Sequence, residues 1–437
     1  TMLALILLLV VPLLLSAVTL LLRRWPSTAS WLAAGSAALL ALAVGAVVPG
    51  SDDPALQWEL LGRLLVLDAA TGEILTLLHA GSALLLLLAA LWPQGQDFVP
   101  ALLASLAPLA LAPMARPFVF GAVALLVAAT VLVALIQAGR AGSTLAATRY
   151  LTVMVLMLPF FLVAGWMLET EQLIFLRTLW RLLFAGFGLL LMGIPFHFWL
   201  RPLIQEAAPL AVVFVLGLSQ LVLVAFAGAV IGGSPVLAQT DLGLWLRVLG
   251  LATMVAAALL LFAARETEQA IAYAVLLDAG VVLATLGAGA TGVATALTVV
   301  LARSLALTLV MVALQLLRQE ESGAQPWWLL LVLGYGAVSL LGLPLTPGFA
   351  GRWQAIALLG AQSPWQALLA VLAVAVAAVG LWRALPLPAF PPADRKLDWR
   401  LIAGPQLIVA VLLLAALLLT LFPSWLPAMA AIGSPPA

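Results

Sequence analysis

Cysteine is absent from this sequence of 437 residues, lysine occurs once, as Lys396, and histidine occurs twice. The lack of cysteine excludes disulfides, thiolate metal sites and thiol nucleophiles. Charged residues make up only 8% of the chain, far below the usage of soluble proteins. The net charge of +1 argues against a nucleic-acid partner. No haem ligand pair or nucleotide fingerprint is present, so we expect no cofactor and no metal.

Apolar residues, in contrast, make up 65% of the chain, and the mean hydropathy is +1.24. These values indicate an all-α integral membrane protein, because a membrane-spanning helix needs about 20 consecutive apolar residues. The first apolar run has no basic residues before it, so we expect a retained span rather than a cleaved signal peptide. A hydropathy scan with a window of about 19 residues predicts about fourteen spans, at 2–22, 28–48, 68–92, 97–113, 117–138, 149–168, 175–200, 207–231, 243–264, 269–289, 291–317, 327–361, 365–386 and 401–421.

Positive charge is distributed unevenly between the predicted loops. Eleven Lys and Arg residues lie in odd-numbered loops, against five in even-numbered loops and the adjoining helix ends. Cytoplasmic loops collect Lys and Arg, so the odd-numbered loops are predicted to lie inside. Both termini would then lie outside a bacterial-type inner membrane. The loop 390–400 would be the main cytoplasmic feature.

Two spans are interrupted in a similar way, at Pro195 and at Pro344. The two prolines are about 150 residues apart, which corresponds to about five span-plus-loop units. Because five is odd, equivalent helices would have opposite orientations, as in the inverted repeats of transporters. We therefore predict two inverted five-helix repeats. The resulting division is 1–96 for the first three helices, 97–231 for the first repeat, 243–386 for the second repeat, and 387–437 for the loop and the last helix.

Four motifs carry a resemblance to a known family. Pro195-Phe-His-Phe-Trp-Leu-Arg-Pro-Leu-Ile-Gln-Glu-Ala-Ala-Pro-Leu-Ala211 resembles the Pro-Phe-His-Phe-Trp segment of the antiporter-like membrane subunits of respiratory complex I. Gly342-Leu-Pro-Leu-Thr-Pro-Gly-Phe-Ala-Gly-Arg-Trp353 is similar to the second broken helix of that family. Ala272-Tyr-Ala-Val-Leu-Leu-Asp-Ala-Gly280 and Leu67-Asp68 match two further segments. The resemblance is closest to the subunit N type and implies a membrane subunit of a multisubunit proton-translocating complex.

The departures from the family bear on mechanism. The resemblance implies a relay of Glu and Lys residues near the middle of the membrane. Here no carboxylate occurs between Asp97 and Glu169, and Leu190 and Gln220 stand where the family has lysines. The charge on the twelfth span is kept as Arg352, and arginine does not lose its proton in proteins. The first repeat is therefore predicted to conduct protons poorly or not at all.

The remaining ionisable residues inside spans are functional candidates, because an unpaired charge in a membrane is costly. Asp278, Arg303 and Arg352 lie on three spans of the second repeat and are predicted to form a buried charge cluster or part of an ion path. His197 at the first break and Gln220 are predicted to line a cavity or a water-filled path. The candidate site residues are thus His197, Gln220, Asp278, Arg303 and Arg352.

From these observations and the resemblance we expect a non-catalytic membrane subunit of a complex I-like, energy-coupled assembly. Its role would be mainly that of a scaffold and interface, with a degenerate proton path. Its partners would be other membrane subunits, lipid, and protons or sodium ions. Alternatives are a stand-alone secondary transporter of a small solute or ion, and a subunit of a sodium/proton antiporter, a hydrogenase or an inorganic-carbon uptake complex. The sequence features are compatible with each of these parent complexes.

Overall fold

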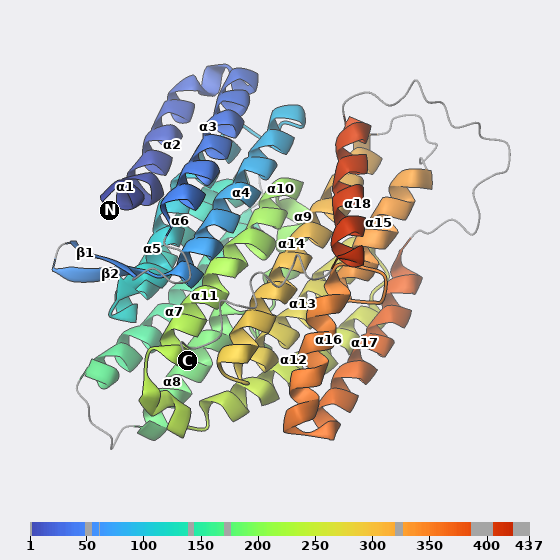
Figure 1. Ribbon diagram of the computed structural model, residues 1–437. Helices are drawn as coiled ribbons and strands as arrows, with labels where there is room; N and C mark the ends of the chain where they lie inside the picture. Colours follow the sequence, from blue (N-terminus) through green and yellow to red (C-terminus); the bar gives the residue numbers. More distant parts are fainter. Residues whose placement is uncertain are drawn as a thin grey trace.

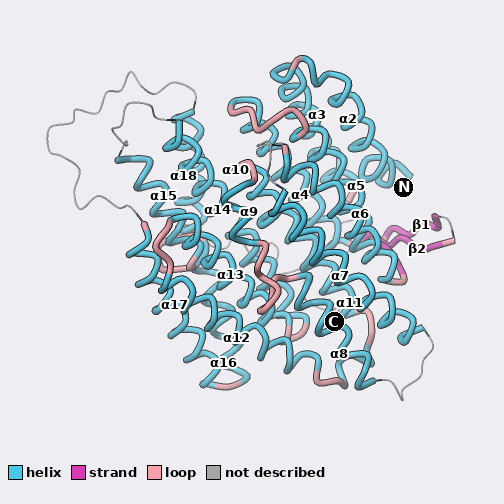
Figure 2. The backbone as a smooth tube through the Cα atoms, turned by 180° about the vertical axis from the view of Figure 1, so that it is seen from behind, coloured by secondary structure: helices cyan, strands magenta, loops and turns pink. Residues whose placement is uncertain are grey.

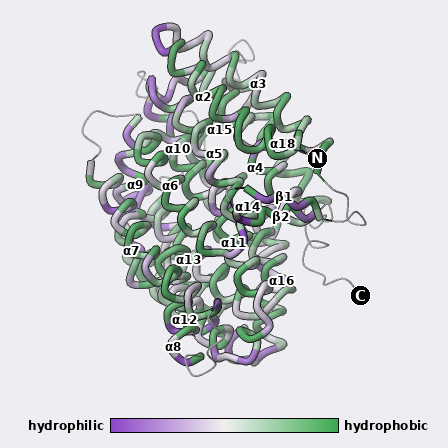
Figure 3. The backbone as a smooth tube through the Cα atoms, turned by 90° about the vertical axis from the view of Figure 1, so that its left-hand side faces the viewer, coloured by the Kyte–Doolittle hydropathy of each residue, from purple (hydrophilic) through white to green (hydrophobic). Residues whose placement is uncertain are grey.

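A computed structural model describes residues 2–48, 55–60, 62–138, 144–169, 176–319, 327–385 and 405–422. These residues form a bundle of tilted helices that run alternately up and down (Figure 1). Apolar residues predominate along most of the helices (Figure 3), as helices that lie in a membrane require. Among the described residues, ten helices are long and apolar enough to cross a membrane, and three apolar helices are shorter. The chain is therefore an all-α, multi-pass membrane protein, as the sequence predicts.

The predicted spans correspond well to the helices. Each predicted range corresponds to one helix or to two or three shorter helical segments, and the long range 327–361 corresponds to α15 and α16. The count of fourteen and the repeat boundaries remain predictions. The helices are α1 Met2–Leu5, η1 Ile6–Val10, α2 Val11–Leu21, η2 Leu22–Arg24, α3 Pro26–Val47, α4 Ala69–Leu91, α5 Phe98–Met114, α6 Phe118–Gln137, α7 Thr144–Glu169, α8 Leu176–Leu190, α9 Leu200–Glu206, α10 Pro209–Val213, η4 Phe214–Leu218, α11 Ser219–Gly232, η5 Pro235–Gln239, α12 Leu242–Ala263, α13 Thr267–Leu286, α14 Ala290–Gln319, α15 Trp327–Leu340, α16 Gly348–Gln362, α17 Pro364–Ala384 and α18 Pro405–Leu421.

A small antiparallel sheet lies at one end of α4 and α6, and the expectation of helices alone missed it (Figure 2). Strands β1 Leu56–Leu60 and β2 Arg63–Leu67 form a hairpin, and β2 also pairs with the short β3 Ala115–Arg116. The Arg63 guanidinium lies 4.2 Å from the centre of the Phe120 ring and so attaches the hairpin to α6. The hairpin positions the start of α4.

Three spans form the interior of the bundle: residues 209–232, α13 and α14. The most apolar part of 209–232 is entirely buried, and those of α13 and α14 are 89% buried, whereas that of Met2–Arg24 is only 17% buried. A helix that is apolar on all sides belongs inside a bundle. Polar side chains on α13 and α14 are therefore held away from lipid and water, and these helices carry the candidate site.

Candidate functional site

The second break separates α15 from α16. Helix α15 ends at Leu340, α16 begins at Gly348, and two residues between them, Gly342 and Leu345, have φ values of +65° and +67°. A side chain on Gly342 would lie 2.7 Å from Cβ of Arg352, so only glycine fits this close approach. Nη2 of Arg352 donates a hydrogen bond of 3.2 Å to the carbonyl oxygen of Leu340. Arg352 thus satisfies a backbone group that the break frees.

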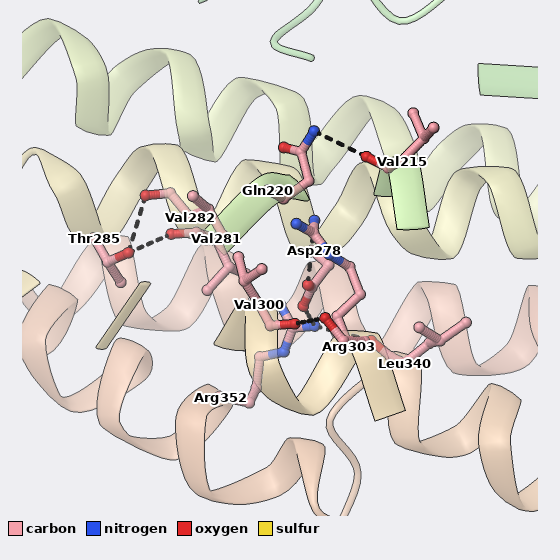
Figure 4. Close-up of polar contacts among 11 residues, drawn as sticks. Val215, Gln220, Asp278, Val281, Val282, Thr285, Val300, Arg303, Leu340 and Arg352 are labelled. Carbon is pink, nitrogen blue, oxygen red and sulfur yellow. Dashed lines mark hydrogen bonds and ion pairs between the residues drawn. The ribbon is translucent and has the colours of Figure 1, made fainter. Parts of the chain in front are cut away.

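The same guanidinium of Arg352 also binds Asp278. Asp278 is 4% exposed and follows the start of α13 by eleven residues, or about 16 Å along the helix axis at the usual rise. Nη2 of Arg352 lies 2.9 Å from Oδ1 of Asp278, and Nη1 of Arg303 lies 3.5 Å from Oδ2 (Figure 4). We call these three residues the charge cluster. It joins α13, α14 and α16 deep in the bundle.

The charge cluster contains two cations and one anion. The carbonyl end of α15, which carries a partial negative charge, offsets part of the excess because Arg352 binds it directly. Among the described residues, Nε and Nη1 of Arg303, Nη1 of Arg352 and Oδ2 of Asp278 have no hydrogen-bond partner. Asp278 is thus held between two groups that keep their protons. This arrangement can fix three helices together, but it contains no lysine to pass a proton on.

The first break, between α8 and α9, contains no such charge. Helix α8 ends at Leu190, a fully buried residue. The amide of Gly193 donates to the carbonyl of Gly188 at 2.8 Å, and the amide of Ile194 donates to Oγ1 of Thr253 at 3.2 Å. Both of these amides therefore have neutral partners inside the protein, whereas the carbonyl of Phe198 accepts from the charged side chain of Arg149 on α7 at 3.3 Å.

His197 lies between α8 and α9 and lines a cavity of about 300 Å³. The lining extends to Tyr273 of α13, which precedes Asp278 by more than one helical turn. The structure thus places His197 at this cavity and does not join it to the charge cluster. The full lining is Leu145, Arg149, His197, Phe198, Leu200, Arg201, Pro202, Gln205 and Tyr273.

Gln220 is buried on α11, and Figure 4 draws its side chain together with the charge cluster. Its amide donates a 3.3 Å hydrogen bond to the carbonyl of Val215, within the π-helical turn η4. Such turns leave backbone carbonyls without their regular partners. The Gln220 amide therefore donates to a backbone carbonyl of its own span rather than to a neighbouring charged group.

Sequence reasoning missed two polar groups that hold this region together. Gln94 donates to the carbonyl of Trp92 and to Oε1 of Gln315, and it accepts from the amide of Leu210. Thr253 binds the first break from α12. Neither residue belongs to a motif: Gln94 lies in the connection between α4 and α5, and a single threonine in a span is too common to be a signal. Glu206, the last residue of α9, accepts a 3.0 Å hydrogen bond from the amide of Ala146 in the first turn of α7.

Comparisons with known proteins agree with this architecture. No protein-family model and no curated protein matches the sequence. A chain of respiratory complex I from Thermus thermophilus with bound NADH is 25% identical, with a TM-score of 0.74 and coverage of 99% of both chains. A chain of the Mrp complex from Dietzia sp. is 16% identical, with a TM-score of 0.77 and coverage of 98% of this chain and 96% of that one.

The membrane-bound sulfane sulfur reductase, an archaeal respiratory membrane complex, contains a further similar chain. That chain is 16% identical, with a TM-score of 0.77, over 95% of this chain and 75% of that one. At this identity the likeness concerns the fold alone. The matches to chains of all three complexes confirm the resemblance that the motifs indicated: this chain is similar to the antiporter-like membrane subunits of complex I and related complexes.

Proposed function

We propose that this chain is a membrane subunit of a multisubunit energy-coupled complex, in which it acts mainly as a scaffold and carries a degenerate proton path. Similarity over 99% of a complex I chain supports the assembly. The observation that carries the reduced role is the pairing of Asp278 with two arginines. Its partners would be other membrane subunits and lipid.

The first half of the proposed path lacks titratable groups at the family's lysine positions. Leu190 is fully buried, and Gln220 binds the carbonyl of Val215 on its own helix. A proton relay needs groups that release and regain a proton near neutral pH, which leucine and glutamine cannot do. This half would therefore support packing rather than transfer.

The second half retains charge, but in a form that resists transfer. The two guanidiniums stabilise the ionised form of the Asp278 carboxylate, and they do not lose protons themselves. Asp278 is the carboxylate on which a path through this half would depend. We therefore expect the charge cluster to hold helices together.

Two experiments test the proposal. Affinity purification of the tagged chain from its own membranes in mild detergent should yield further membrane subunits in fixed ratio. A single homogeneous chain that binds a solute would favour a stand-alone transporter.

In the purified complex, Asp278→Asn combined with Arg303→Met leaves the net charge of the cluster unchanged. Proton translocation per turnover in liposomes should also be unchanged, and a fall with intact assembly would contradict the reduced path.

We further propose a bacterial-type inner membrane with both termini outside. In support, charges of the odd-numbered loops meet on one face: Arg201 pairs with Glu266 at 3.2 Å and Arg318 with Glu268 at 2.8 Å. The loop 390–400 lies outside the described residues. A single cysteine introduced there, in a chain without cysteine, should react with an impermeant thiol reagent only from the cytoplasmic side. Labelling from outside would reverse the orientation.

A further inference from the structure

The cavity at the first break combines cationic and polar side chains from several helices, and the proposed function does not use it. Arg149 comes from α7, His197 from the break, Arg201 from α9 and Tyr273 from α13, around a volume of about 300 Å³. Convergent polar groups around a concave space are the usual sign of a ligand site. Two arginines in this lining favour an anionic ligand.

The charges around the cavity leave donors free for such a ligand. Arg201 gives one N–H to Glu266 at 3.2 Å, and Arg149 gives one to the carbonyl of Phe198 at 3.3 Å. Each guanidinium has five N–H donors in a planar fork. Among the described residues, no carboxylate forms an ion pair with Arg149. Of the nearby acids, Glu206 is engaged by the amide of Ala146.

The cavity also lies at the level where membrane helices end. Helix α7 begins at Thr144, α12 ends at Ala263 and α13 begins at Thr267. Hydrophilic residues gather around α9 at this edge of the bundle (Figure 3). Lipid headgroups lie at this depth, and the orientation proposed above places the cavity in the cytoplasmic leaflet, whose surface carries negative charge in many membranes.

The apolar part of the lining suits a lipid as well. Leu145 is 45% exposed and Phe198 is 42% exposed, beside the two arginines. A phosphate has oxygens for a guanidinium fork, and a glycerol and acyl chains would pack on the apolar residues. We propose that this cavity binds a phosphate group, supplied by the headgroup of an anionic phospholipid.

The test uses the purified full chain in phosphatidylcholine nanodiscs, into which phosphatidylglycerol is titrated. After release of the protein from the nanodiscs, native mass spectrometry should show one retained phosphatidylglycerol per chain. The melting temperature of the protein should rise as phosphatidylglycerol is added. Arg149→Gln should weaken this binding by about tenfold, the effect of one lost charged hydrogen bond. Arg149→Lys keeps the charge but loses the planar fork, so its affinity for phosphatidylglycerol should lie between those of the wild type and Arg149→Gln. This variant also tests the proposal if Arg149→Gln folds poorly.

The matched control is Arg177→Gln on α8, an exposed arginine that does not line the cavity. It removes the same charge and should leave phosphatidylglycerol binding unchanged. Inorganic phosphate added to pure phosphatidylcholine nanodiscs provides the second arm: a rise in melting temperature that Arg149→Gln abolishes would support the phosphate site and assign it to a soluble ligand. Equal loss in Arg149→Gln and Arg177→Gln, or wild-type binding by Arg149→Gln, would overturn the proposal.

Discussion

The two broken helices solve the same backbone problem with different chemistry. At the first break, backbone carbonyls and the hydroxyl of Thr253 accept the freed N–H groups, and the partly exposed Arg149 binds the carbonyl of Phe198. At the second, the charged side chain of Arg352 binds a freed carbonyl and a carboxylate together. A proline-containing break in a membrane helix therefore needs internal partners, but it does not need a buried ion pair. The charge at the second break is an additional feature with its own cost.

That cost determines how the two halves should respond to mutation. A buried charge is stable only while its partners remain, whereas the first break, which contains no buried ion pair, loses one hydrogen bond at a time. The second half should therefore fail abruptly when Asp278 is changed, and the first half should tolerate single changes unless a charge is introduced.

The largest expected effect is that of Asp278→Ala. It leaves two guanidiniums without an anion, and breaking a buried pair costs about 3–5 kcal/mol. We expect a strong loss of assembled protein, measured by size-exclusion chromatography, and a lower melting temperature. Asp241→Ala is the control, because Asp241 is exposed at the start of α12.

Rescue should identify the more dispensable arginine. Arg303 contacts Asp278 only at 3.5 Å, whereas Arg352 also binds the carbonyl of Leu340. Asp278→Ala with Arg303→Met should therefore recover more protein than Asp278→Ala with Arg352→Met. The opposite order in the double-mutant cycle would show that the α15 end does not depend on Arg352.

The second effect in size is expected from Leu190→Lys in the first half. Leu190 is fully buried, and a lysine in the middle of a membrane costs about 3 kcal/mol. Melting temperature and yield should both fall, while Leu190→Met should change little. A lysine variant as stable as the wild type would mean that a carboxylate or water lies beside position 190, and the two halves would then be less different than we infer.

Sequence reasoning predicted the features that depend on residue type and spacing. The two interrupted spans follow from Pro195 and Pro344, and the predicted span 68–92 agrees with α4, at whose start the carboxylate of Asp68 accepts the amide of Thr71 at 2.7 Å. The candidates Asp278, Arg303 and Arg352 follow from the rarity of charge in spans. Hydropathy, prolines and charged residues can be read directly from the local sequence, so they were sufficient for these predictions.

The remaining features depend on distance in space rather than in sequence. That Arg352 would also bind Leu340 depends on a turn at Gly342 with φ of +65°, which no hydropathy pattern encodes. The hairpin of β1 and β2 is held by its pairing with β3, about 50 residues later. His197 and Asp278 were grouped as one candidate site, yet helix packing puts them in different surroundings.

A smaller effect is expected from Thr253→Val at the first break. The variant removes the hydroxyl that accepts the amide of Ile194, and a buried amide without a partner costs about 1–3 kcal/mol. The melting temperature should fall moderately, while Thr253→Ser, which keeps the hydroxyl, should stay close to the wild type. Equal melting temperatures of the valine and serine variants would mean that the amide of Ile194 has another hydrogen-bond partner at the first break. The hydrogen bonds of the first break would then be more redundant than those of the second break.

The smallest effect concerns Glu206, the last residue of the short helix α9 that follows the first break. Glu206 accepts the amide of Ala146 at the start of α7, at the end of a helix rather than in the middle of the membrane. Glu206→Gln keeps an acceptor oxygen and removes only the charge, and a charge at a helix N-terminus is worth about 0.3–1 kcal/mol. The melting temperature should therefore fall slightly, and less at high salt because partly exposed charges are screened. Glu206→Leu, which also removes the hydrogen bond, should cost more. A fall in melting temperature for Glu206→Gln as large as that for Asp278→Ala would show that the first half also depends on a buried charge. The contrast between the two breaks would then no longer hold.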